Sequence, residues 1–132
     1  MTLVVDASLV VAAFAGVSPL GSWADSVLDT NELLSAPHLM PVEAANILRR
    51  EALLGHISAD AASIAHADVT ALPVELFPYV PLAARIWELR PNLTAYDAWY
   101  VALAEYLDAR LATLDLKLAK AHGPRCGFVT PP

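Results

Sequence analysis

The sequence contains a single cysteine, Cys126, among its 132 residues. One thiol excludes an intrachain disulfide and a zinc site built from several cysteines. The four histidines show no spacing typical of metal ligands, so we assign none of them to a site. A chain without disulfides suits a reducing compartment, and we therefore expect a cytoplasmic protein.

The sequence also lacks a long apolar segment. Its longest run, Leu9 to Val17, is well short of the roughly 20 residues that a membrane-spanning helix needs. Signal peptides carry basic residues ahead of their apolar segment, and none precedes this run. We therefore expect neither a membrane span nor a signal peptide.

Basic residues are few. The chain has 8 lysines and arginines against 14 acids, which gives a formal net charge of −6 at pH 7. Nucleic-acid-binding domains usually carry a basic surface, so the overall charge alone argues against that function. Cations bound among the acids reverse this inference, because a metal ion inverts the local field.

What the sequence does contain is a large apolar fraction. Hydrophobic residues make up 57% of the chain and charged residues 17%, and a chain of this length suits one domain, here residues 1–132. Short apolar runs alternate with segments of helical periodicity, which is typical of a parallel sheet covered by helices. We predict an α/β fold with a small parallel central sheet of about five strands, flanked by helices.

The expected element boundaries follow from caps, prolines and glycines. Strands are predicted over 3–5, 33–36, 74–77, 111–113 and 127–130. Helices are predicted over 7–15, 19–29, 38–54, 59–72, 81–90, 95–109 and 117–122. The predicted caps are Ser18, Ser58 and Thr94, with Pro19 at the first position of its helix, and the predicted stops are Gly55 and Gly123.

Four acids stand at the ends of these elements. Two follow predicted strands and two lie in the first turns of predicted helices: Asp6, Asp115, Glu43 and Asp97. Each has an ordinary structural explanation. The first two are suited to cap the helices that follow, Asp97 completes the spacing of a capping box with Thr94, and Glu43 shares a helix face with Arg50.

Taken together, the acids predict a metal site. The carboxyl ends of parallel strands meet at one edge of a sheet when the crossovers are right-handed, so three of these four sites are expected to face that edge. Carboxylates packed together repel until a proton or a cation neutralises them. Oxygen ligands without histidine or cysteine select Mg²⁺ or Mn²⁺, and such sites cleave phosphodiesters.

The residues around these acids resemble a known family. Four segments are similar to the four signature blocks of PIN-domain ribonucleases: Val4-Val5-Asp6-Ala7-Ser8, Glu43-Ala44-Ala45-Asn46-Ile47-Leu48, Thr94-Ala95-Tyr96-Asp97-Ala98 with Ala102-Leu103-Ala104, and Ala112-Thr113-Leu114-Asp115. Their order and spacing resemble the VapC toxins of bacterial type II toxin–antitoxin pairs. The resemblance spans nearly the whole chain.

The resemblance implies a three-layer PIN-like fold and an Mg²⁺- or Mn²⁺-dependent endoribonuclease that cleaves RNA, with tRNA or rRNA as the expected substrate, and so inhibits translation. It implies that the acids Asp6, Glu43, Asp97 and Asp115 are both catalytic and metal-binding, with Thr113 as a supporting hydroxyl. The expected partners are a VapB-type antitoxin and a second copy of the chain, in a homodimer or in a heterotetramer or larger complex with the antitoxin.

Further residues are weaker candidates. Ser8 is suited either to support the site or to hydrogen-bond the nearby backbone. Asn46 is suited either to orient the Glu43 carboxylate or to face solvent. Four basic residues are candidate phosphate contacts, with solvated surface charge as the alternative for each: Arg49, Arg50, Lys117 and Lys120. Four aromatic residues are expected in the core or at a dimer contact: Trp87, Tyr96, Trp99 and Tyr100.

Two other classes of function are alternatives to the nuclease. A receiver domain that accepts a phosphoryl group is also a small α/β fold, but it needs paired acids after the first strand, and no pair follows Val5. A catalytically silent binding module would hold its partner through an apolar groove near Val10, Val11 and Phe14. The presence of all four acids favours the nuclease over the binding module.

Overall fold

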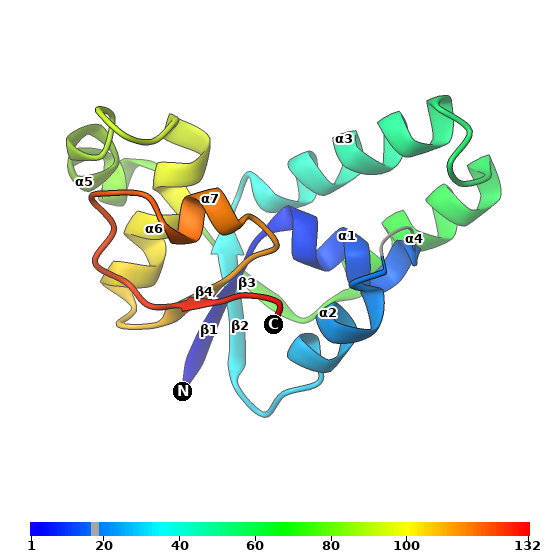
Figure 1. The fold of residues 1–132 in the computed structure, drawn as a ribbon, viewed down its shortest axis with the longest axis horizontal. Helices are drawn as coiled ribbons and strands as arrows, with labels where there is room; N and C mark the ends of the chain where they lie inside the picture. The colour runs from blue at the N-terminus through cyan, green and yellow to red at the C-terminus, as the bar shows by residue number, and fades with distance from the viewer. Residues whose placement is uncertain (17–18) are drawn as a thin grey trace.

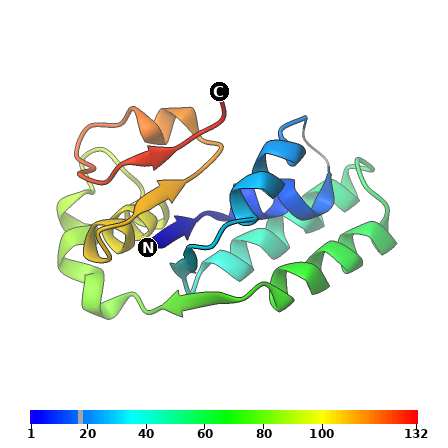
Figure 2. The same cartoon turned by 90° about the horizontal axis from the view of Figure 1, so that it is seen from below.

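The computed structural model describes residues 1–16 and 19–132. Its described residues form a five-stranded sheet in the order β3-β2-β1-β4-β5, and every neighbouring pair is parallel. Figure 2 shows the strands side by side, with β3 and β5 at the two edges. The strands are β1 (Thr2–Val5), β2 (Leu33–Pro37), β3 (Val74–Phe77), β4 (Arg110–Ala112) and β5 (Phe128–Val129). The predicted α/β class and parallel sheet are confirmed.

Helices cover the sheet in two groups (Figure 1). The first group consists of α1 (Ala7–Ala15), α2 (Gly21–Leu28), α3 (Met40–Leu53) and α4 (Ala59–Ala71), which pack against one another. The second consists of the 3₁₀ turn η1 (Val80–Leu82), α5 (Ala83–Glu88), α6 (Ala95–Tyr106) and α7 (Leu116–Ala119). Within the second group, α6 packs directly against β1, β2 and β4. No helix in the described part of the chain is long and apolar enough to cross a membrane.

The central strand positions the functional edge of the sheet. β1 pairs with β2 on one side and with β4 on the other, so the strand order reverses direction at β1. Parallel α/β sheets bind ligands outside the carboxyl ends of their strands at such a switch point. Val4 and Val5 are fully buried because helices cover both faces of this strand. The chain leaves β1 at Asp6, directly at the switch point.

Local signals set several boundaries as predicted. The helix after β1 covers the predicted residues, and it ends at Gly16, whose φ of 64° suits glycine. Ser58 caps α4 by accepting a hydrogen bond from the Ala61 amide. Gly55, with a φ of 77°, follows the end of α3 as expected.

Other boundaries differ from the prediction. Pro19 lies in a turn, and the helix that it was expected to begin starts two residues later, at Gly21. The predicted cap Ser18 lies outside the described residues. Pro37 was expected to end the second strand but belongs to it, opposite Phe77 of the edge strand β3.

The C-terminal third contains the largest differences. The predicted helix 95–109 ends at Tyr106, because Asp108 adopts a left-handed conformation with a φ of 50°. The Ala109 amide then donates to the Ala104 carbonyl at 2.9 Å, a pattern that terminates helices. The last helix covers 116–119 instead of 117–122. β4 keeps the predicted length but begins and ends one residue earlier than 111–113, and β5 is shorter than the predicted 127–130.

Candidate active site

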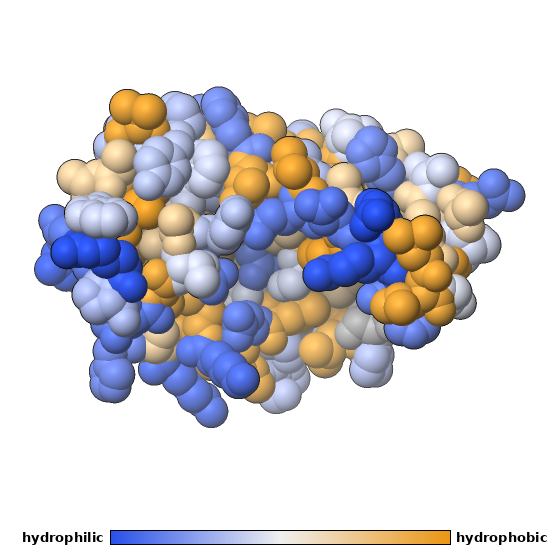
Figure 3. Space-filling view, turned by 90° about the horizontal axis from the view of Figure 1, so that it is seen from above, coloured by the Kyte–Doolittle hydropathy of each residue, from blue (hydrophilic) through white to orange (hydrophobic). Residues whose placement is uncertain are grey.

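A cavity of about 560 Å³ opens at the carboxyl edge of the sheet. Figure 3, seen from above this edge, shows hydrophilic side chains gathered around a central hollow, with hydrophobic patches to either side. The four predicted acids all line the cavity, and each comes from a different segment: Asp6, Glu43, Asp97 and Asp115. Their convergence on one cavity is what the sequence predicted.

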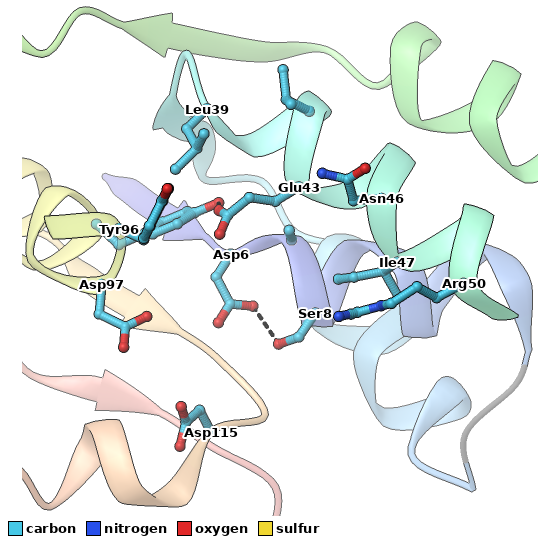
Figure 4. A pocket seen from close by; sticks show the side chains of 13 residues that line it. Asp6, Ser8, Leu39, Glu43, Asn46, Ile47, Arg50, Tyr96, Asp97 and Asp115 are labelled. Carbon is cyan, nitrogen blue, oxygen red and sulfur yellow. Dashed lines mark hydrogen bonds between the residues drawn. The ribbon is translucent and has the colours of Figure 1, made fainter. Parts of the chain in front are cut away.

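Asp6 is the most deeply placed acid. It is 9% exposed and follows directly after β1. Its Oδ1 accepts hydrogen bonds from the Leu9 amide at 3.0 Å and from Ser8 Oγ at 2.8 Å (Figure 4). The first bond caps α1, so the capping role and a place in the cavity belong to the same side chain.

Thr113 connects Asp6 to the fourth acid. Its buried hydroxyl donates to Asp6 Oδ2 and accepts a hydrogen bond from the Asp115 amide at 3.0 Å. Asp115 is more exposed, and its Oδ1 caps α7 by accepting from the amides of Lys117 and Leu118 at 2.9 and 3.1 Å. The end of β4 and the end of β1 are thereby joined through one threonine hydroxyl.

Asp97 reaches the cavity from the first turn of α6. Its amide donates to the Thr94 hydroxyl at 3.2 Å, which is the predicted cap. Figure 4 shows its carboxylate, with those of Asp6 and Asp115, directed toward the same space. The short helix α7 and the start of α6 therefore approach the end of β1 from one side.

Glu43 extends from the first turn of α3 toward Asp6 (Figure 4). Its Oε1 accepts a hydrogen bond from the Tyr100 hydroxyl at 2.6 Å. Tyr100 is 3% exposed, as its predicted place in the core requires, but sequence reasoning missed its contact with the site. Two signals pointed to it: Tyr100 lies one helical turn after Asp97, and a buried tyrosine hydroxyl usually has a hydrogen-bond partner.

The acids are electrostatically strained. Burial raises the pKa of Asp6 above its usual value, and the negative charge of Asp97 raises it further, while the three hydrogen bonds oppose the rise. Burial also raises the pKa of Glu43, and the charges of Asp6 and Asp97 add to the effect. The pKa of Asp97 is raised by burial and then by Asp115. Each of these carboxylates is harder to ionise in the cavity than in water.

No cationic side chain in the described part of the chain pairs with these acids to relieve the repulsion. Among the described residues, none of the four acids forms an ion pair, including Glu43 with its helix neighbour Arg50. Carboxylate oxygens with unneutralised charge are the donor set that Mg²⁺ and Mn²⁺ prefer, so the chemistry of the cavity fits such an ion. Within the described chain, no three histidine, cysteine, aspartate or glutamate side chains have metal-ligand spacing. Joint coordination by the four acids therefore stays a prediction.

The weaker candidates separate by position. Ser8, Asn46 and Arg50 line the cavity. Ser8 is hydrogen-bonded to Asp6. Asn46 was expected to orient Glu43, but no hydrogen bond joins the two among the described residues. The hydrogen bond to Glu43 comes from Tyr100 instead. Arg49 faces a separate shallow depression between α3 and α4.

The basic residues differ in whether they are already paired. Lys117 and Lys120, on and just after α7, are exposed. Among the described residues, ion pairs involve Arg85 and Arg110 but not the four basic residues predicted to contact phosphate, Arg49, Arg50, Lys117 and Lys120. These four side chains are free to bind an external anion.

The other aromatic residues, predicted in the core or at a dimer contact, divide by exposure. Trp99 packs edge-on against Tyr79, with ring centroids 5.3 Å apart. Tyr96 and Trp87 are 60% and 65% exposed, so neither is a core residue of this chain. Tyr96 lines the cavity beside Asp97, and Trp87 is covered by the Arg90 guanidinium 4.5 Å from its ring centroid.

Comparisons with known proteins agree with the geometry. The family model described as "PIN domain" matches residues 3–123. The VapC ribonuclease Mb0985 of Mycobacterium bovis is 40% identical over 130 residues, which cover 98% of both chains. The crystal structure of PAE2754 from Pyrobaculum aerophilum superposes with a TM-score of 0.72 at 29% identity, covering 97% of this chain and 83% of that one.

A more distant structure shares the fold alone. VapBC2 from Rickettsia felis, bound to a DNA fragment from its promoter, has a TM-score of 0.71 at 14% identity, and the match covers all of both chains. The arrangement of strands and helices is thus preserved where little of the sequence is.

Proposed function

The chain belongs to the PIN-domain family and is an endoribonuclease toxin of the VapC type, and we propose that it cleaves RNA with the four acids at the carboxyl edge of its sheet, Asp6, Glu43, Asp97 and Asp115. The observation that carries this proposal is the shared cavity. Four carboxylates from four segments line it, and three of them have a pKa raised by burial and by one another. Carboxylates with raised pKa values that share a cleft are typical of functional sites.

We propose Mg²⁺ or Mn²⁺ as the cofactor, with the four acids as its ligands. When bound, the ion supplies Lewis acidity, lowering the pKa of a water and stabilising negative charge on the phosphoryl group. The protein's own contribution is to hold the ligands. Asp6 is fixed by Ser8, Leu9 and Thr113, and these hydrogen bonds favour its ionised form against the effect of burial.

The proposed substrate is RNA, with a tRNA or an rRNA as the target. Arg50 on one wall and Lys117 beside the fourth acid are suited to bind phosphates on either side of the scissile bond, because neither has an ion-pair partner in the described chain. By analogy with the family, the products carry a 5′-phosphate and a 3′-hydroxyl. The net charge of −6 implies that contacts outside the cavity contribute little to RNA affinity.

The proposed partners are a VapB-type antitoxin and a second copy of this chain, in a homodimer or in a heterotetramer or larger complex with the antitoxin. The exposed apolar side chains support such assembly, since Val42 and Tyr96 border the cavity at 57% and 60% exposure. A partner that covers them also closes the site. We place the pair in the cytoplasm, where the RNA is.

Asp6→Asn tests the proposed site. Asparagine keeps the shape of the side chain and can still cap α1, but it removes the charge at the centre of the cavity. We expect RNA cleavage in metal-controlled buffer to fall by more than about 100-fold, beyond the loss typical of an outer-shell change, while circular dichroism and thermal unfolding show a folded protein.

Asp68→Asn is the matched control, because this aspartate is exposed on α4 away from the cavity. It should cleave like the unmodified chain. Equal activity of the Asp6→Asn and unmodified proteins would overturn the site assignment. Absence of metal-stimulated cleavage of any cellular RNA by the unmodified chain would instead favour a silent binding module.

A further inference from the structure

The Tyr100 hydroxyl occupies a junction between the segments that carry the acids. It donates to Glu43 on α3 at 2.6 Å, and the backbone amide of Ala7, the residue after Asp6, interacts with the same hydroxyl. Its own helix carries Asp97 one turn earlier. The hydroxyl on α6 is thus hydrogen-bonded to α3, in the cavity that the start of α1 also lines.

The two partners of this hydrogen bond differ in freedom. Glu43 is half-buried, and three rotatable bonds separate its carboxylate from the backbone of α3. The ring of Tyr100 is 3% exposed and packed among the core residues of α6, so its hydroxyl has a defined place. A hydrogen bond between them makes the mobile carboxylate adopt the position that the fixed hydroxyl dictates.

The hydrogen bond also makes the two carboxylate oxygens of Glu43 different from each other. Oε1 of Glu43 is bonded to Tyr100, and no hydrogen bond to Oε2 is found among the described residues. In Figure 4 the Glu43 carboxylate is turned toward Asp6 rather than out along α3. A glutamate without this partner would favour solvent, away from the repelling charges of Asp6 and Asp97.

We propose that Tyr100 is a positioning residue of the nuclease site, whose hydroxyl holds the Glu43 carboxylate in the acid cavity. This inference rests on the proposed function of the four acids, and it adds a role for a residue that contacts neither the RNA nor the ion. Outer-shell hydrogen bonds of this kind orient ligating carboxylates and typically change metal affinity by about 10–100-fold when removed.

Tyr100→Phe is the direct test, because it deletes only the hydroxyl. We expect the Mn²⁺ dissociation constant, measured by titration calorimetry without RNA, to rise by about 10-fold, and kcat to fall while KM for RNA is little changed. Tyr106→Phe is the matched control: it lies on the same helix, is 70% exposed and should change neither quantity.

A double-mutant comparison separates positioning from general packing. If the hydroxyl acts through Glu43, removing it from a Glu43→Ala protein has nothing left to position. Glu43→Ala and Glu43→Ala/Tyr100→Phe should then have equal Mn²⁺ affinity and equal residual activity. A further loss in the double variant, as large as in Tyr100→Phe alone, would show a merely structural role and overturn the proposal.

A spectroscopic measurement does not depend on the stability of Tyr100→Phe. In the otherwise unmodified chain, the Tyr100 hydroxyl proton should exchange slowly enough to give its own NMR signal, and Glu43→Ala should abolish it. Persistence of the signal in Glu43→Ala would contradict the hydrogen bond.

Failure of the inference can be told from failure of the proposed function. If Asp6→Asn and Glu43→Ala abolish metal-stimulated cleavage but Tyr100→Phe keeps the unmodified affinity and kcat, only the positioning role is wrong. If Asp6→Asn leaves cleavage intact, the nuclease site itself is wrong.

Discussion

The two ends of α6 place acids in opposite environments. Asp97, in the first turn, faces other carboxylates, and its pKa is raised. Glu105, in the last turn, is bonded through both oxygens to the Arg85 guanidinium at 2.7 and 3.1 Å and also accepts from the Arg125 amide. The pKa of Glu105 is lowered, since these hydrogen bonds and the charge of Arg85 outweigh its burial.

The difference lies in the partners, not in the helix. Both carboxylates are partly buried, but Glu105 is paired with a cation, whereas the charged neighbour that shifts the pKa of Asp97 is the anion Asp115. The Arg85 guanidinium also bonds Glu88 and the Gly123 carbonyl, so it ties α5, α6 and the loop after α7 together. An acid with its own cation stabilises the fold, whereas an acid without one is available to an external cation.

Changing each acid to its amide should have opposite effects at the two ends of α6, one on cleavage and the other on stability. These are the largest effects that we expect. Asp97→Asn should reduce RNA cleavage by more than about 100-fold, beyond an outer-shell loss, with thermal stability preserved. Glu105→Gln should keep cleavage but lower the free energy of unfolding by roughly 1–2 kcal/mol, because a charge-assisted pair is lost. Cleavage assays and denaturant unfolding of both variants measure the two effects.

Arg85→Met is the counterpart on the other side of the ion pair. It should resemble Glu105→Gln in stability and the unmodified chain in cleavage, because Arg85 lies away from the cavity. A strong loss of activity in Glu105→Gln with unchanged stability would show that the two ends of α6 are not functionally distinct.

The pH dependence of stability should sharpen the comparison with a smaller effect. The ordinary pKa values are 3.8 for Asp6 and Asp97 and 4.5 for Glu43, and folding raises all three. The folded chain therefore binds these protons more tightly than the unfolded chain does. Their stabilising contribution is complete below the ordinary values and is lost as pH rises through the raised ones.

In chelator, the free energy of unfolding should therefore decline as pH rises above about 4–5, near the ordinary pKa values of these acids. Glu105 acts with the opposite sign, since its lowered pKa contributes stability that disappears as pH falls. Mg²⁺ at neutral pH should restore stability by mass action. Asp6→Asn should flatten the decline and weaken the response to Mg²⁺; a decline as steep as in the unmodified chain would contradict the assignment.

The smallest expected effect concerns two adjacent arginines. Arg50 lines the cavity and Arg49 faces the depression beside α4, so their alanine variants change the net charge equally and differ only in place. Arg50→Ala should raise KM for RNA several-fold and reduce the slope of log affinity against log salt by about 0.7, one phosphate contact to a single strand. Arg49→Ala should change both less. Equal effects would indicate general charge attraction.

Much of the fold could be predicted because its signals are local. The apolar run ending at Asp6, the serine cap at Ser58 and the glycine stop at Gly55 each act over a few residues, and each is confirmed. The end of α6 could not be predicted this way. The sequence stays largely apolar to Ala109, and although aspartate adopts the left-handed conformation more often than most residues, one aspartate does not by itself mark the end of a helix.

The acids of the candidate site could also be predicted, but one of their contacts could not. Its acids lie at strand ends and first helical turns, positions that a parallel sheet gathers at one edge, and helical periodicity placed Arg50 on the face of Glu43. Tyr100 was interpreted as core or dimer packing, because an aromatic residue on an apolar helix gives no sign of where its hydroxyl points.

The sequence by itself thus determined the order of strands and helices and the identity of the acids that meet at the sheet edge, since caps, apolar periodicity and right-handed crossovers are sufficient for both. Only the tertiary structure decided which atoms touch. Thr113 reaches Asp6 across 107 positions and Tyr100 reaches Glu43 across 57. Such contacts depend on how side chains from separate elements pack to within a few tenths of an ångström, and that geometry is a property of the assembled core rather than of any local stretch.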